Sequence, residues 1–106
     1  MEIAGIEFGG PYNIDTTSIP ANRAAVYVII CQTKDGKYHV IDVGESGETG
    51  VRLANHERRS CWKEKCNGSL SVYLHYMPSS QGYDVDSRRQ LERKIRQQYS
   101  PPCGKM

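Results

Sequence analysis

The sequence has no long apolar run and few large apolar aromatic side chains. Its 106 residues include one Trp and one Phe, beside seven Tyr. No stretch approaches the roughly 18 apolar residues that a membrane-spanning helix requires. The first ten residues carry Glu2 and Glu7 and lack the basic residues that open a secretory signal. We therefore expect a cytoplasmic protein with no membrane partner.

Internal repeats and low-complexity segments are also absent, and the chain is short. A length of 106 residues matches one domain of the common size, roughly 100–150 residues, and leaves no room for a separate recognition domain. Turn-forming residues are dense over 9–23, the segment GGPYNIDTTSIPANR. We predict a single domain over 1–106, with a lead-in segment at 1–23, which is a loop from residue 9 onward, and a core at 24–104.

Acidic and basic residues are unevenly distributed, although the net charge is only +2. Residues 1–50 hold three basic and seven acidic side chains, a net charge of −4. Residues 51–106 hold eleven basic and five acidic side chains, a net charge of +6. A basic half of this kind favours an anionic partner such as nucleic acid.

The four cysteines are Cys31, Cys61, Cys66 and Cys103. Cysteines of a protein without a secretory signal are usually reduced, so we predict four free thiols. The alternative is a structural zinc ion bound by Cys61 and Cys66, with His56 and Cys103 as the remaining ligands. The Cys-x4-Cys spacing is unusual for such a site.

The apolar pattern predicts a small α+β domain. Apolar, β-branched runs at 24–31 and 38–44 flank Lys34-Asp35-Gly36-Lys37, in which Asp-Gly is typical of a hairpin turn. Alternating apolar residues predict a third strand at 70–76. Ser87-x-x-Gln90 predicts a capping box that opens a helix ending at 98 or 99. With short helices expected at 51–58 and 60–66, the order is ββααβα: a small antiparallel three-stranded sheet flanked by helices.

Four polar side chains stand out in this layout. Tyr27 points to the face of its strand opposite to its apolar neighbours. Arg52 and His56 are four residues apart and project from one face of the predicted first helix. Glu92 flanks the apolar stripe of the last helix. Each also has a purely structural explanation. Tyr27 would be a core tyrosine whose hydroxyl is hydrogen-bonded, Arg52 and His56 would lie on a solvent-exposed helix face, and Glu92 would belong to a surface ion pair.

Together, these four residue types suit phosphodiester hydrolysis. A glutamate can hold a divalent metal ion against a phosphate oxygen. An arginine can stabilise charge that develops on the phosphoryl group, and a tyrosine or histidine can orient or deprotonate the attacking water.

The spacing of these residues resembles that of the GIY-YIG nuclease domain. That family begins with strands that carry Gly-Ile-Tyr and Tyr-Ile-Gly, and here Ala25-Val26-Tyr27 and Asp42-Val43-Gly44 stand in their places. The family has an Arg ten residues after the first Tyr of the second motif, which is Arg52 here, and a Tyr or His one helical turn later, which is His56.

The resemblance extends to the last helix and covers about 24–104. A metal-binding Glu of the family corresponds to Glu92, in the segment Leu91-Glu92-x-x-Ile95. The family's closing Pro-containing turn and Asn correspond to a segment that ends at Gly104. Two departures matter: the second-motif Tyr is Asp42, and the closing Asn is Gly104.

The resemblance implies a metal-dependent endonuclease that cleaves DNA. Tyr27 would be the general base or its relay, His56 would assist proton transfer, Arg52 would stabilise the transition state, and Glu92 would bind Mg²⁺ or Mn²⁺. Asp42 is either a solvated aspartate or, in a sharper hypothesis, a second ligand that joins Glu92 around the metal. Basic residues that we expect to contact phosphates are Arg58, Arg59, Lys63, Lys65, Arg88, Arg89, Arg93 and Arg96.

Two other functions remain open at this point. The first is a nucleic-acid-binding module on the same fold that has lost catalysis at Asp42 and Gly104. The second is a small zinc-stabilised interaction domain. Since the sequence holds no recognition module, we expect specificity to come from DNA structure, a protein partner or self-association.

Overall fold

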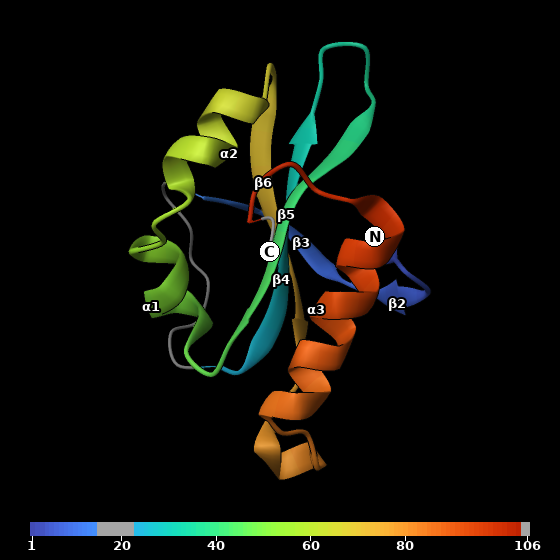
Figure 1. Ribbon diagram of the computed structural model, residues 1–106, viewed down its shortest axis with the longest axis vertical. Coiled ribbons are helices and arrows are strands. Elements are labelled where there is room, and N and C mark those ends of the chain that lie inside the picture. The colour runs from blue at the N-terminus through green and yellow to red at the C-terminus, as the bar shows by residue number, and fades with distance from the viewer. Residues whose placement is uncertain (15–22, 105–106) are drawn as a thin grey trace.

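The protein is an α+β domain built on a four-stranded antiparallel sheet. The computed structural model describes residues 1–14 and 23–104. The sheet has the strand order β3-β6-β4-β5, and Figure 1 looks onto its β5 edge, with α1 and α2 on one side and α3 on the other. The strands of this sheet are β3 (Gly9–Asn13), β4 (Ala25–Gln32), β5 (Tyr38–Ser46) and β6 (Ser69–Tyr76).

The remaining elements are short except for the last helix. A two-stranded ribbon, β1 (Glu2–Ile3) with β2 (Ile6–Glu7), opens the chain. The helices are α1 (Thr49–Ala54), α2 (Arg59–Lys65), the 3-10 turn η1 (Ser79–Gln81) and α3 (Val85–Tyr99). In the part of the chain that the structure describes, no helix combines the length and apolarity needed to cross a membrane.

The expected α+β class and antiparallel pairing are confirmed, but the expected count of three strands is wrong. The additional strand of the main sheet is β3, which lies in the segment that was predicted to be a loop, and the ribbon of β1 and β2 was not predicted either. Its sequence Gly-Gly-Pro-Tyr-Asn has no apolar alternation, since an edge strand that is mostly exposed does not need one. Pairing with β6 holds β3 in place. The rest of the predicted loop at 15–22 lies outside the described residues.

Several helix boundaries also differ from the prediction. α1 begins at Thr49 and ends at Ala54 instead of spanning 51–58. The helix does not reach Arg58, because the N–H of Arg58 donates to His56 Nδ1 and not to the carbonyl four residues earlier. α3 begins at Val85, and its capping box is formed by Asp84 and Ser87 instead of Ser87 and Gln90.

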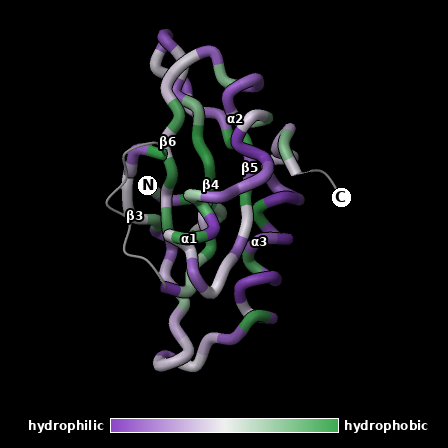
Figure 2. Tube along the Cα trace, turned by 90° about the vertical axis from the view of Figure 1, so that its left-hand side faces the viewer, coloured by the Kyte–Doolittle hydropathy of each residue, from purple (hydrophilic) through white to green (hydrophobic). Residues whose placement is uncertain are grey.

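Two apolar cores lie on the opposite faces of the sheet. The alternation of β4 sends Tyr27, Ile29 and Cys31 toward the face that α1 and α2 cover, where Trp62 is fully buried. The residues between them, such as Val28, pack against the face that α3 covers with Ile95. Figure 2 shows β4 and β6 as the apolar middle of the molecule, with hydrophilic residues concentrated along the helices.

All four cysteines are paired, so the prediction of four free thiols is wrong. Disulfides join Cys31 to Cys66 and Cys61 to Cys103. The first connects β4 to the end of α2, and the second connects α2 to the segment after α3. These pairs are 35 and 42 residues apart in the sequence, so no local spacing reveals them. Because all four cysteines are in disulfides, they cannot bind zinc, and the alternative of a structural zinc site is also wrong.

Candidate functional site

The candidate site lies at the β5 edge, where the helices of both faces approach the same strand. α1 and α2 pack against β5 from one face, and α3 packs against it from the other. The segment after α3 crosses this edge, since Cys103 N donates to Ile41 O at 3.0 Å. Residues that are distant in the sequence therefore surround the middle of β5.

Tyr27 and His56 form a buried hydrogen-bonded pair in this site. Tyr27 Oη lies 2.7 Å from His56 Nε2, and both residues are almost completely buried. His56 is not on a helix with Arg52, as the sequence predicted, but in the turn between α1 and α2. The turn nevertheless brings its ring against Tyr27.

The tautomer of His56 follows from its second hydrogen bond. The backbone N–H of Arg58 donates to His56 Nδ1 at 3.0 Å, so Nδ1 carries no proton and Nε2 carries it. His56 Nε2–H thus donates to Tyr27 Oη. Burial lowers the pKa of His56 to about 4, with further lowering by Arg52 and Arg58. At neutral pH the ring is an uncharged donor that positions Tyr27.

The hydroxyl of Tyr27 is protonated at neutral pH. Burial raises its pKa to about 12, although the guanidinium groups of Arg52 and Arg58 act in the opposite direction. Because the oxygen accepts from His56, the O–H proton of Tyr27 points elsewhere. This tyrosine can therefore donate to a bound oxygen, and its ionised form has stabilising groups around it.

Gly44 leaves the space that the Tyr27 ring occupies. The two residues face each other across the β4–β5 pair, and a Cβ at position 44 would lie 2.2 Å from Tyr27 Oη. Any side chain there would collide with the tyrosine. The last residue of Asp42-Val43-Gly44 is therefore a glycine because only a glycine leaves room for the Tyr27 ring.

Arg52 is held by a carboxylate that the sequence analysis did not single out. Its Nη1 and Nη2 donate to the Glu57 carboxylate at 2.5 and 3.0 Å. The bond to Arg52 lowers the pKa of Glu57 to about 2. The Glu57 side chain is 63% exposed, so the pair lies at the surface, next to Tyr27.

Asp42 is at the centre of a buried charged cluster and does not join Glu92 around a metal. Its carboxylate accepts from Arg58 Nε at 2.7 Å, Trp62 Nε1 at 2.7 Å and Arg96 Nη2 at 2.9 Å. Asp42 is fully buried, so the alternative of a solvated aspartate is also wrong. Asp42 pairs with Ile29, so ordinary strand alternation puts its carboxylate on the face of Tyr27 and Trp62. The register irregularity follows at Ile41 and brings that residue to the same face.

The cluster around Asp42 joins the two sides of the site. Arg58 belongs to the start of α2 and Arg96 to α3, so Asp42 binds one cation from each face of the sheet. The positive charge of Arg58 lowers the pKa of both Tyr27 and Glu92. Arg58 thus lies within electrostatic reach of the tyrosine on one side and the glutamate on the other.

Glu92 is a half-buried carboxylate beside an arginine-rich cavity of α3. Arg89, Arg93 and Arg96 line this cavity with it. Its Oε1 is 3.6 Å from Arg96 Nε, a buried group without a hydrogen-bond partner in the described residues. Burial raises the pKa of Glu92, and its carboxylate accepts no short hydrogen bond from any described residue.

The residues around Glu92 fit a divalent ion that arrives with a phosphate. Mg²⁺ is usually held by one or two carboxylates together with phosphate oxygens and water, and Glu92 supplies one such carboxylate. The three arginines that surround it would repel a bare cation but attract the phosphate. Among the described residues, no group of three or more His, Cys, Asp or Glu is arranged to hold a metal alone.

The other predicted phosphate-binding residues occupy varied positions. Arg88 is mostly buried and bonds Glu45 at 2.9 Å, whereas Arg89 is 59% exposed. Arg59 donates to the backbone carbonyls of Leu53 and Ile14 and so ties the turn after β3 to α1. Exposed members of the set are Lys63, Lys65, Arg89 and Arg93.

Sequence reasoning missed the contacts that define the cluster. Arg96 was expected to contact phosphates, and neither Trp62 nor Glu57 was singled out. The Arg52–Glu57 pair spans five residues across the end of α1, a spacing that no helical rule selects. In comparisons with known proteins, this chain matches no family model, no curated protein and no solved structure.

Proposed function

We propose that this chain is a metal-dependent endonuclease that hydrolyses phosphodiester bonds in DNA at the β5 edge. The observation that carries the proposal is the hydrogen bond of 2.7 Å between Tyr27 Oη and His56 Nε2. It leaves a buried tyrosine hydroxyl with a fixed donor on one side and two arginines nearby. The resemblance of the motif spacing to the GIY-YIG domain supports the same function.

Tyr27 acts at the attacking water in this proposal. Tyr27 first gives its own proton to solvent, and the phenolate oxygen then takes a proton from the attacking water. The water oxygen bonds to phosphorus while the bond from phosphorus to the leaving sugar oxygen breaks, and that oxygen takes up a proton from solvent. The His56 Nε2–H and the charges of Arg52 and Arg58 stabilise that phenolate. Because the pKa of His56 is about 4, His56 serves as the donor and not as the base near neutrality.

Arg52 and Glu92 act on the phosphate. An incoming phosphate displaces Glu57 from Arg52 and takes over both N–H donors, so charge that develops on the phosphoryl oxygens is stabilised. A divalent ion bound through Glu92 would supply positive charge at a phosphate oxygen. The cavity arginines Arg89 and Arg93 hold the neighbouring backbone.

The test is cleavage of supercoiled plasmid in the presence of Mg²⁺ or Mn²⁺. Loss of a metal ligand costs several kcal/mol of transition-state stabilisation, so Glu92→Gln is expected to reduce the rate about a hundredfold or more. Glu64→Gln, an exposed carboxylate on α2, is the matched control. Equal rates for Glu92→Gln and the unmodified chain would reject the proposal.

The second candidate is a DNA-binding module without turnover. It is favoured by the closed state of the site, since Tyr27 is 1% exposed and Arg52 is already paired with Glu57. Binding of labelled DNA that needs no divalent ion, with no product after prolonged incubation with Mg²⁺, would support this candidate instead.

A further inference from the structure

A second cavity lies on the same strand as the candidate site. Its volume is about 530 Å³, which is in the range of small-ligand sites. It is lined by the first four residues of β5, by the end of α2 and by the segment after α3. We call it the hairpin groove, after the β4–β5 turn beside it.

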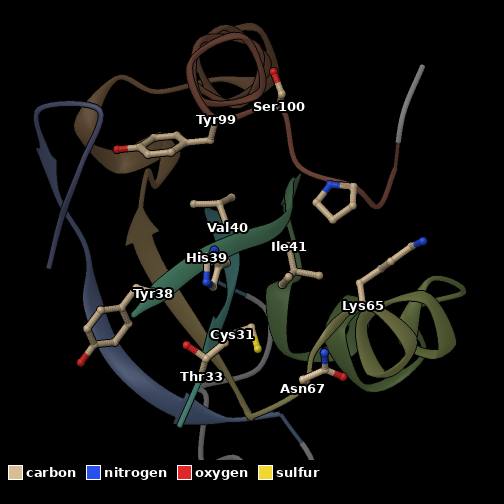
Figure 3. A pocket seen from close by; sticks show the side chains of 11 residues that line it. Cys31, Thr33, Tyr38, His39, Val40, Ile41, Lys65, Asn67, Tyr99 and Ser100 are labelled. Carbon is tan, nitrogen blue, oxygen red and sulfur yellow. The ribbon is translucent and has the colours of Figure 1, made fainter. Parts of the chain in front are cut away.

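Two tyrosines expose their rings at the hairpin groove. Tyr38 is 52% exposed and Tyr99 is 39% exposed, and both are among the four most exposed large apolar residues in the described part of the chain. The hydroxyl of Tyr99 accepts from the backbone N–H of Ala4 at 3.3 Å, which fixes its ring. Figure 3 shows the two rings on one side of the groove and Lys65 on the other.

The polar groups of the hairpin groove favour an anion. Its lining contains Lys65, His39 and Asn67, and none of the described lining residues is an Asp or Glu. Lys65 and Asn67 are exposed at the end of α2, so their N–H groups are open to a ligand. Flat aromatic rings beside a cation, without any carboxylate, match a nucleobase with its phosphate.

We propose that the hairpin groove binds unpaired nucleotides of the nucleic-acid strand that is cut at the β5 edge. This inference rests on the proposed function for its context. One base stacks on Tyr38 and another on Tyr99, while Lys65 contacts a phosphate of the same strand from the other side of the groove. The substrate class is a nucleic acid with a single-stranded stretch beside the cleaved bond.

The distance along β5 sets the position of that single-stranded stretch. Gly44, which faces Tyr27, is the sixth residue after Tyr38 on β5, and a rise of ~3.3 Å per residue makes this roughly 20 Å. At ~3.4 Å per stacked nucleotide this corresponds to about six nucleotides. Both sites border the segment after α3: Pro102 lines the hairpin groove, and Gly104 adjoins Asp42.

The test measures binding without cleavage. A fluorescein-labelled oligothymidylate of eight nucleotides is titrated with the protein in EDTA, with fluorescence anisotropy as the readout, beside a duplex of equal length. Tyr38→Ala is expected to weaken single-strand binding about tenfold, because base stacking on an aromatic ring is lost. Tyr38→Phe keeps the ring and is expected to bind as the unmodified chain does.

The charge of Lys65 is tested by salt dependence. Lys65→Ala is expected to reduce the slope of log affinity against log salt by about one. Lys94→Ala removes an exposed lysine of α3 outside the groove and is expected to leave the slope unchanged. An oligoglutamate peptide of equal charge is expected not to compete with the oligonucleotide.

Several results would overturn the inference. Equal binding by Tyr38→Ala and Tyr38→Phe would do so, as would equal slopes for Lys65→Ala and Lys94→Ala, or full competition by the oligoglutamate. These outcomes are distinct from failure of the proposed function, since the binding assay is carried out in EDTA and needs no cleavage. If the protein bound the oligonucleotide through Tyr38 but did not cut DNA, the proposed nuclease activity would be rejected. Nucleotide binding in the hairpin groove would still stand.

Discussion

Gly104 lies directly against the carboxylate of Asp42. A Cβ at position 104 would stand 2.8 Å from Asp42 Oδ1 and 2.7 Å from Arg96 Nη2. These positions carry the two main departures from the GIY-YIG spacing that the sequence resembles, and the fold makes them neighbours. The buried cluster of Asp42, Arg58 and Arg96 takes up the space that a side chain at 104 would need. The two departures therefore belong to one local arrangement.

Gly104→Ala is expected to lower the free energy of unfolding by about 2–3 kcal/mol, because it combines backbone strain with a collision inside the charged cluster. The control is Gly82→Ala. Gly82 has a similar backbone angle, φ +85° against +72°, but nothing lies within 4 Å of its Cβ position. Urea denaturation of both variants separates the strain from the collision, and equal losses would show that the collision costs nothing.

Gly44→Ala is expected to displace Tyr27 and break its bond to His56. Overpacking of a buried site typically costs about 1–3 kcal/mol. Gly47→Ala on the following loop is the control, since its nearest neighbour is 3.8 Å away. The specific readout is the ¹⁵N chemical shifts of the His56 ring. Unchanged shifts in a folded Gly44→Ala protein would contradict the expected displacement.

The sequence predicted the elements whose patterns are local. β4, β5, β6 and α3 follow from apolar runs, alternation and a capping signal, and the strands appear within one or two residues of their expected bounds. β3 was missed because its partner β6 lies about sixty residues away, and edge pairing leaves no apolar signature.

The candidate site was only partly predictable, because many of its contacts join residues that are distant in the sequence. Tyr27 was correctly placed on its face by strand alternation, and it meets His56 although the expected helix between Arg52 and His56 ends early. Asp42 was misjudged because its hydrogen-bond donors, Arg58, Trp62 and Arg96, are 16, 20 and 54 residues away in the sequence. The pairing of the cysteines depends on tertiary contacts, and four cysteines allow three pairings without them.

Stability is expected to fall as the pH drops from about 6.5 to about 4. The pKa of His56 is about 4 in the folded state and roughly 6.5 in an unfolded chain. Between these values the unfolded state binds more protons, so protonation favours unfolding. The loss amounts to at most about 3 kcal/mol. The contribution of Glu57, whose pKa is about 2 when folded, is lost only at lower pH.

Denaturant titrations at pH 7.0 and pH 4.5 measure this effect. His56→Gln is expected to abolish most of the difference, since its side chain does not titrate. His39→Gln, which removes an exposed histidine, is expected to keep it. If His56→Gln retained the full difference, another group would have to be responsible.

Both disulfides are expected to stabilise the fold. A thiol titration of denatured, unreduced protein is expected to find none of the four cysteines reactive. Each bridge closes a loop of roughly 40 residues, for which chain-entropy arguments give about 4 kcal/mol. Cys61→Ser with Cys103→Ser is therefore expected to lower the free energy of unfolding by about 2–5 kcal/mol. Four reactive thiols would instead support the reduced, cytoplasmic state that the sequence suggested.

Glu57 is expected to compete with a phosphate for Arg52. Glu57→Gln removes the charge that holds both N–H donors of Arg52, so affinity for DNA in EDTA is expected to rise several-fold, since a solvent-exposed ion pair is easily displaced. Glu64→Gln also removes one exposed negative charge nearby on α2 and reports the general effect of net charge. In an Arg52→Ala background, Glu57→Gln is expected to add no more than Glu64→Gln does. An equal gain from both carboxylate changes in the unmodified background would show that Glu57 does not guard Arg52.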